Sequence, residues 1–264
     1  MAVTKQYTTG LAKGQGLIDE TLSLLGIWEP STKSMELANK AVQEGILGRA
    51  TGYRARDIVT RAFASRYLVN GARPAYYLKT LLNEGVSPPA LTQLLLIYTA
   101  RANAVLHDYI CEIYWPQYAN GSLTLGRQEA LKFLEDAYHL GKLQQRWTEN
   151  MMVRVARYLG GCLEDFGLLK SKRTGKREIS PIYITPLTTL FLAHELHFSG
   201  ISDDGILQHR DWGLFGLRMM EILRELQRVS RNHFIAQFSG EFVRISWKYQ
   251  TMEEAIRAIA RSEF

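Results

Sequence analysis

Apolar residues recur at steps of three and four along most of this 264-residue chain. That spacing places them on one face of an α-helix, whereas a half-buried strand would need strict alternation. Gly and Pro residues cluster between the periodic segments, where they are expected to end helices and form turns. Two stretches depart from the pattern, and residues 168–184 and 234–247 are predicted to form β-hairpins. The sequence therefore predicts a mainly α, multi-helical fold with one or two small β-hairpins.

The predicted helices fall into two parts. Residues 1–85 predict short helices separated by turns, which is the layout of a helix-turn-helix unit. Residues 86–264 predict a helical core that contains a long apolar helix at 91–114. This part continues through a helix at 148–166 into a winged-helix-like region, with the wing at about 168–184. With 46% hydrophobic residues, the chain is long enough to bury a sizeable core in this way.

Capping residues indicate where individual helices begin. Ser34 is expected to cap one helix, and Thr251 is expected to cap the last one. Ser202 stands directly before Asp203 and Asp204, so a helix cap explains these carboxylates more simply than an acid/base pair does.

Basic residues are concentrated in two windows of the sequence. The whole chain has 32 Lys plus Arg against 26 Asp plus Glu, a formal net charge of +6. Residues 49–79 hold seven basic and one acidic residue, and residues 142–178 hold nine basic and four acidic residues. The rest of the chain is therefore net acidic. The two basic windows coincide with the two helix-turn-helix candidates, which is the pattern of a polyanion-binding surface.

The solvent-facing sides of these elements supply the candidate DNA contacts. In a winged helix, one helix enters the major groove and the wing follows the phosphates. Arg66 lies nearer the apolar stripe of its helix and is expected to be structural. The predicted DNA-binding residues are Arg49, Arg54, Arg56 and Arg61 in the first part, Arg154 and Arg157 in the helix before the hairpin, and Lys170, Lys172, Arg173, Lys176 and Arg177 in the wing.

A simpler interpretation of each basic group stays open. Lys and Arg at a hairpin tip are also the ordinary solvated end of a turn. Likewise, Asp57 and Arg61 are spaced four residues apart, so they predict a surface ion pair worth a few tenths of a kcal/mol.

Motifs for catalysis and for cofactors are missing from the sequence. His194 and His197 are three residues apart, whereas a zincin helix needs four, and we expect both at the margin of an apolar helix. The glycines between Gly10 and Gly16 do not match the dinucleotide fingerprint. Gly175-Lys176 lacks the upstream Gly of a P-loop. We therefore expect no enzyme activity, no cofactor and no metal.

The sequence also predicts where the protein is found. Its most apolar stretch, at residues 91–100, is far shorter than the roughly 20 residues that a membrane-spanning helix needs. Residues 1–16 lack the apolar centre of a signal peptide. The two cysteines, Cys111 and Cys162, do not form a disulfide framework. We expect a cytoplasmic protein without a membrane segment.

Several short segments spread over nearly the whole chain carry a family pattern. They are Tyr7-Thr8-Thr9-Gly10, Gly16-Leu17-Ile18 with Glu20, the helix Arg54 to Leu68 with its arginines, Arg154-Val155-Ala156-Arg157-Tyr158-Leu159, and Asp165-Phe166-Gly167-Leu168-Leu169. With these segments the chain resembles the BrxA family of BREX (bacteriophage exclusion) defence systems. None of them is a catalytic signature.

The resemblance implies a mostly helical, non-enzymatic protein that binds double-stranded DNA. It would act beside a methyltransferase, an ATPase and other BREX proteins in phage resistance. The alternative is a scaffold module whose basic faces dock onto other components of the defence system, since a winged-helix fold can serve either role. RNA binding is less favoured, because the aromatic motif of common RNA-binding folds is missing from the sequence.

Overall fold

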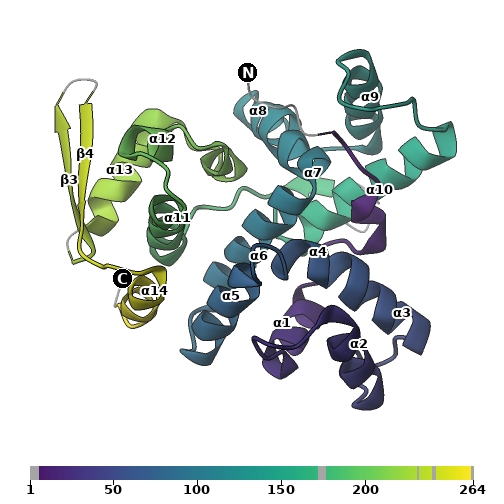
Figure 1. Ribbon diagram of the computed structural model, residues 1–264. Helices are drawn as coiled ribbons and strands as arrows, with labels where there is room; N and C mark the ends of the chain where they lie inside the picture. The colour runs from purple at the N-terminus through teal and green to yellow at the C-terminus, as the bar shows by residue number, and fades with distance from the viewer. Residues whose placement is uncertain (1–5, 172–176, 231, 240–241, 263–264) are drawn as a thin grey trace. The chain divides into compact units, whose positions relative to one another are not determined.

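The computed structural model describes residues 6–171, 177–230, 232–239 and 242–262. It confirms the mainly helical prediction, and two small antiparallel sheets of two strands each correspond to the predicted hairpins. The chain divides into two compact units (Figure 1). Unit 1 comprises Met1–Tyr76 and Leu95–Ile182, and unit 2 comprises Tyr77–Leu94 and Tyr183–Phe264. None of the helices in the described ranges has the length and apolar character needed to span a bilayer.

The N-terminal part of unit 1 is a series of short helices. Thr51 caps the helical run that starts at Gly52, and its hydroxyl accepts a hydrogen bond from the Arg54 amide at 3.2 Å. Ser34 does not cap its helix; Lys33 holds the capping position, and the Glu36 carboxylate accepts from its amide. The elements are a 3₁₀ turn at Gly10–Lys13, α1 (Ile18–Ile27), α2 (Ser34–Gln43), α3 (Gly52–Asp57), a π-helical segment at Ile58–Phe63 and α4 (Ala64–Tyr67).

The middle of the chain differs from the predicted single long helix at 91–114. That region begins earlier, at Pro88, because proline fits the first turn of a helix, where its missing N–H is not needed. It also breaks at Asn103, whose backbone leaves the helical region and whose side-chain amide donates to the Thr99 carbonyl at 2.8 Å. The elements here are α5 (Arg73–Asn83), α6 (Pro88–Ala102), α7 (Ala104–Tyr109), a π-helical segment at Ile110–Tyr114 and α8 (Trp115–Ala119). The predicted boundary at residues 85 and 86 falls in the turn between α5 and α6.

The end of unit 1 contains two packed helices followed by a hairpin. They are α9 (Arg127–His139), α10 (Glu149–Asp165), β1 (Leu169–Ser171) and β2 (Arg177–Ile179). β1 and β2 pair antiparallel, with Lys170 opposite Glu178. Glu178 also forms a bridge to Thr124, so β2 has β1 on one edge and the extended segment 123–125 on the other. This pairing joins the chain before α9 to the hairpin after α10.

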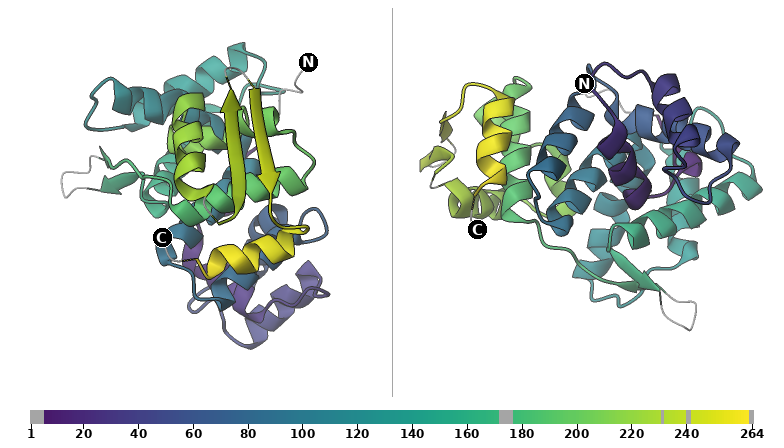
Figure 2. Two further views of the ribbon diagram at one scale, coloured as in Figure 1. Left: turned by 90° about the vertical axis from the view of Figure 1, so that its left-hand side faces the viewer. Right: turned by 90° about the horizontal axis from the view of Figure 1, so that it is seen from below.

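Unit 2 also contains helices followed by a two-stranded hairpin, and a last helix follows this hairpin. Residues 210–215 form a 3₁₀ turn that ends at Gly216 in the left-handed region, and helix α13 (Met219–Ser230) begins after it. In Figure 2, β3 lies beside α13, and β4 also contacts α12. The elements are α11 (Pro186–Phe198), α12 (Asp203–Leu207), the 3₁₀ turn Arg210–Phe215, α13 (Met219–Ser230), β3 (Phe234–Ser239), β4 (Phe242–Trp247) and α14 (Met252–Ala260).

Two predicted caps in unit 2 are confirmed. The hydroxyls of Ser202 and Thr251 each accept a backbone amide at 3.2 Å, at the starts of α12 and α14. Asp203 has a further role that the sequence does not indicate. Its carboxylate accepts from the Ile245 amide at 2.8 Å and faces the Trp247 indole N–H at 3.3 Å, so it ties the start of α12 to β4.

The predicted position of His194 at a helix margin is wrong. Its side chain is completely buried, and its Nδ1 lies 2.8 Å from the Leu190 carbonyl. The β3–β4 hairpin brings Phe234 and Trp247 against the ring and so covers this side of α11. His197 is partly exposed and stacks on Trp247 with ring centres 4.3 Å apart.

Candidate nucleic-acid interface

A groove of about 920 Å³ lies within unit 1, between the start of α9, the first half of α10 and β2. Four arginines from these three elements line it: Arg127, Arg154, Arg157 and Arg177. Polar side chains, among them Gln128 and Asn150, complete the lining. Glu129 also lines the groove, and its carboxylate accepts a hydrogen bond from the Gly126 amide at 3.0 Å. The groove therefore presents mainly positive charge.

Helix α10 places two of these arginines by its own periodicity. Arg154 and Arg157 are three residues apart and share an exposed face. Val155 and Leu159 lie on the opposite face and are completely buried. The helix is thus anchored by one side while the other carries the charges, as the sequence predicts.

Arg177 is held more firmly than a solvated hairpin residue. Its guanidinium Nε lies 3.0 Å from the Glu164 carboxylate, and its side chain is 29% exposed. Its Nη1 occupies space that a side chain at Gly160 would need, 2.6 Å from an ideal Cβ position there. Arg177 therefore both lines the groove and ties β2 to α10.

Of the four other predicted wing residues, the structure describes one. Lys170 lies on β1 with its side chain exposed. Lys172, Arg173 and Lys176 lie outside the described residues.

The predicted N-terminal arginines do not line this groove. Arg61 pairs with Asp57 at 3.1 Å and Arg54 approaches the same carboxylate at 3.6 Å, so the predicted surface ion pair is present. Arg54 also lines a separate cavity of about 590 Å³, which includes carboxylates of α1 and α10. Arg49 and Arg56 are exposed on the surface around the start of α3. Arg66 is buried, as expected, and its guanidinium donates to the carbonyls of Gly14 and Gly16.

Sequence reasoning missed Arg127, which is the first residue of α9. The residues on either side of it are uncharged and it lies outside both basic windows, so charge counting does not single it out. What brings it to the groove is the pairing of residues 123–125 with β2, through backbone bonds from Leu125 to Arg177 and from Ile179 to Leu123. Such a long-range pairing leaves no local signal in the sequence.

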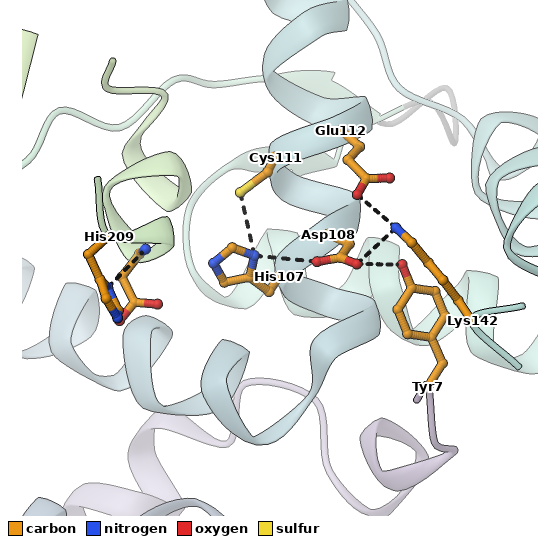
Figure 3. Close-up of polar contacts among 8 residues, drawn as sticks. Tyr7, His107, Asp108, Cys111, Glu112, Lys142 and His209 are labelled. Carbon is orange, nitrogen blue, oxygen red and sulfur yellow. Dashed lines mark hydrogen bonds and ion pairs between the residues drawn. The ribbon is translucent and has the colours of Figure 1, made fainter. Parts of the chain in front are cut away.

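A cluster of titratable groups in unit 1 lies around Asp108 (Figure 3). Its carboxylate accepts hydrogen bonds from the Tyr7 hydroxyl at 2.8 Å and from the Lys142 ammonium at 3.0 Å. Lys142 also reaches Glu112 at 2.8 Å. Burial alone would raise the pKa of Asp108, but hydrogen bonds from His107, Tyr7 and Lys142 hold it well below its usual value. The cluster ties the N-terminal segment to α7 and to the loop after α9.

His107 in this cluster does not have the geometry of a catalytic relay. The Cys111 sulfur and a carboxylate oxygen of Asp108 both lie 3.6 Å from the same ring nitrogen, Nδ1 (Figure 3). A nucleophile–histidine–carboxylate relay needs one ring nitrogen for each partner. Across the described part of the chain, no group of three or more His, Cys, Asp or Glu side chains is arranged to hold a metal ion.

Comparison with known protein families identifies the chain. Residues 5–195, which include the groove and the whole of the Asp108 cluster, match the BrxA family. The chain belongs to the BrxA family. BrxA proteins are components of BREX phage-defence systems, so this chain is a BREX protein.

The fold is shared with a solved structure. A crystal structure of an uncharacterized protein from Magnetospirillum magneticum aligns with a TM-score of 0.58 at 14% sequence identity. The alignment covers 73% of this chain and 94% of the other. At this identity the likeness of the BrxA chain to that protein concerns the fold. No curated protein matches the sequence.

Proposed function

We propose that this BrxA protein is a non-enzymatic, double-stranded DNA-binding accessory component of its BREX system. The observation that carries the proposal is the groove in which Arg127, Arg154, Arg157 and Arg177 converge from three elements. Phosphate contacts supply much of the affinity of DNA-binding proteins, and arginine is well suited to them because its planar donors match phosphate oxygens.

The order of elements around the groove supports a winged-helix mode of binding. A segment beside β2, two packed helices and a two-stranded hairpin follow one another in the sequence, as in winged-helix proteins. In that mode α10 enters the major groove, so Asn150 and Arg154 in its first half are the side chains that face base edges. Arg127 at the start of α9 and Lys170 on β1 contact phosphates.

A salt titration tests the proposal directly. The affinity for a DNA duplex is measured at several salt concentrations for the native protein and for the double variant Arg154→Ala/Arg157→Ala. Each phosphate contact adds about 0.9 to the slope of log affinity against log salt, so the double variant should flatten the slope by up to about 2. The matched control is Arg146→Ala/Arg257→Ala, which removes the same charge from exposed positions outside the groove.

The control distinguishes a specific interface from general charge attraction. If both double variants change the slope equally, the groove is not the contact surface. If the native protein does not retard a duplex even at low salt, DNA binding itself is excluded.

A second function, docking onto other BREX proteins, is favoured by one observation in unit 2. Met219 and Met220 are adjacent at the start of α13, with 49% and 63% of their surfaces exposed. Methionine is enriched in protein interfaces and depleted on solvent-facing surfaces. Co-purification with BREX partners that survives nuclease treatment, and that is lost in Met219→Ser/Met220→Ser, would support this role.

A further inference from the structure

Tyr53 presents an aromatic ring to solvent at the start of α3. Its surface is 77% exposed, whereas Phe63 and Tyr67 further along the same helical run are buried. Within the described ranges, no ring contact, hydrogen bond or ion pair joins the Tyr53 side chain to another residue. Its neighbour Gly52 packs toward Val42 of α2, with an ideal Cβ position 3.6 Å from that side chain. The ring therefore contributes nothing to the core of unit 1.

Two exposed arginines lie near Tyr53 in the sequence. Arg56 is three residues further along the helix, on the same face as Tyr53, and its Nη1 lies 4.0 Å from an ideal Cβ position at Gly52. Arg49 is exposed in the turn before the helix. Neither forms an ion pair with a described residue, in contrast to Arg54 and Arg61, which share Asp57. The tyrosine face and its cations are thus available to a ligand.

An exposed aromatic ring with one uncompensated arginine on its own helix and another in the preceding turn has the chemistry of a base-stacking platform. The ring stacks on the flat face of a nucleobase, and the arginines neutralise the adjoining phosphates. In an intact duplex each base is already stacked on its neighbours, so the ring needs a base that is unpaired. A large apolar partner would not explain why both nearby residues are cations.

We infer that Tyr53, with Arg49 and Arg56, binds an unpaired base of DNA. The inference rests on the proposed function, which it deepens: besides holding duplex through the groove, unit 1 recognises DNA in which a base has left the stack. The relevant ligands are gapped, bulged or locally melted DNA.

The test compares two duplexes at one salt concentration. One is fully paired, and the other carries a 2-aminopurine opposite an abasic position, which leaves the fluorescent base unpaired. The native protein should bind the second duplex on the order of tenfold more tightly and change its fluorescence by stacking. Tyr53→Ala should lose the preference and the fluorescence change but keep its affinity for paired duplex. Tyr53→Phe should retain both, because the ring face is kept.

Tyr183 provides the matched control, since it is 81% exposed and lies in unit 2. Tyr183→Ala should behave as the native protein. Equal native affinity for the two duplexes, or a preference that persists in Tyr53→Ala, overturns the inference and leaves the groove proposal intact. Binding of the unpaired probe without binding of paired duplex supports the inference and overturns the groove proposal. Binding of neither overturns both.

Discussion

The backbone amide of Gly16 donates a 2.8 Å hydrogen bond to the Asp165 carboxylate, which joins the N-terminal segment to the last turn of α10. Next to it, the Gln15 side chain lies against Gly161, where a Cβ would meet its amide oxygen at 2.2 Å. Gly161 is accordingly buried. A segment near residue 16 thus helps to hold the helix that carries Arg154 and Arg157.

Gly16→Ala is expected to destabilise the protein. An ideal Cβ on Gly16 would lie 2.5 Å from the Asp165 Cβ, an atom held close to the backbone of α10. Because neither atom can rotate away, the segment or the helix has to shift, at a cost of about 1–3 kcal/mol. The free energy of unfolding in urea measures this loss. The matched control is Gly26→Ala in α1, where the Cβ meets no atom within 4 Å and helix propensity predicts a gain of up to about 1 kcal/mol.

Arg66→Ala is expected to destabilise the protein more strongly than any surface arginine substitution. Arg66 is 2% exposed, and its guanidinium donates to the backbone carbonyls of Gly14 and Gly16. Removing it leaves two buried carbonyls without this donor, a loss of about 3 kcal/mol. Chemical denaturation checks the value. Arg61→Ala removes a residue with a 56% exposed side chain and should cost less than about 1 kcal/mol; equal costs would contradict the buried role of Arg66.

The helical fold and the ends of many helices are predictable from the sequence because they depend on neighbours in the chain. Ser202 and Thr251, which stand before helical runs, cap their helices as expected. Pro88 shows where local rules conflict: proline both ends one helix and begins another, and the structure uses it as a start. The same local periodicity predicts which face of α10 is buried.

The site is less predictable because it depends on pairings between distant segments. Arg127 reaches the groove through the contact of residues 123–125 with β2, some fifty residues later in the sequence. The burial of His194 has the same kind of cause, since the cover comes from aromatic residues of β3 and β4. Periodicity within a helix shows which side is polar, but it does not show what another part of the chain brings to that side.

Asp108→Asn is expected to loosen the N-terminal segment. The Asp108 side chain is 16% exposed, and its carboxylate accepts hydrogen bonds from the Tyr7 hydroxyl and the Lys142 ammonium. Because the low pKa of Asp108 reflects these contacts, its contribution is present above its unfolded value near 4 and is lost as the pH falls below it. The neutral amide should cost about 2 kcal/mol and speed amide hydrogen exchange around residue 7.

Glu112→Gln is the matched control, because it also removes one negative charge next to Lys142 but leaves the contact between Asp108 and Tyr7 in place. Glu112 contacts the same lysine, but its side chain is 48% exposed, so its loss should cost less than about 1 kcal/mol. If both variants exchange equally fast around residue 7, Asp108 is not the anchor.

Unit 2 is expected to lose stability between about pH 6.5 and pH 4 because of His194. Burial lowers the pKa of His194 from 6.5 to about 4, so the folded protein keeps the ring neutral while the unfolded chain protonates. Stability from this group is therefore complete above pH 6.5 and falls as the pH decreases, by about 3 kcal/mol at pH 4. An NMR titration of the ring protons should give a midpoint near 4, whereas a midpoint near 6.5 would show that the ring is accessible to water. In urea unfolding at pH 7 and pH 4, His194→Leu should lose less stability over this range than the native protein, because leucine has no proton to gain.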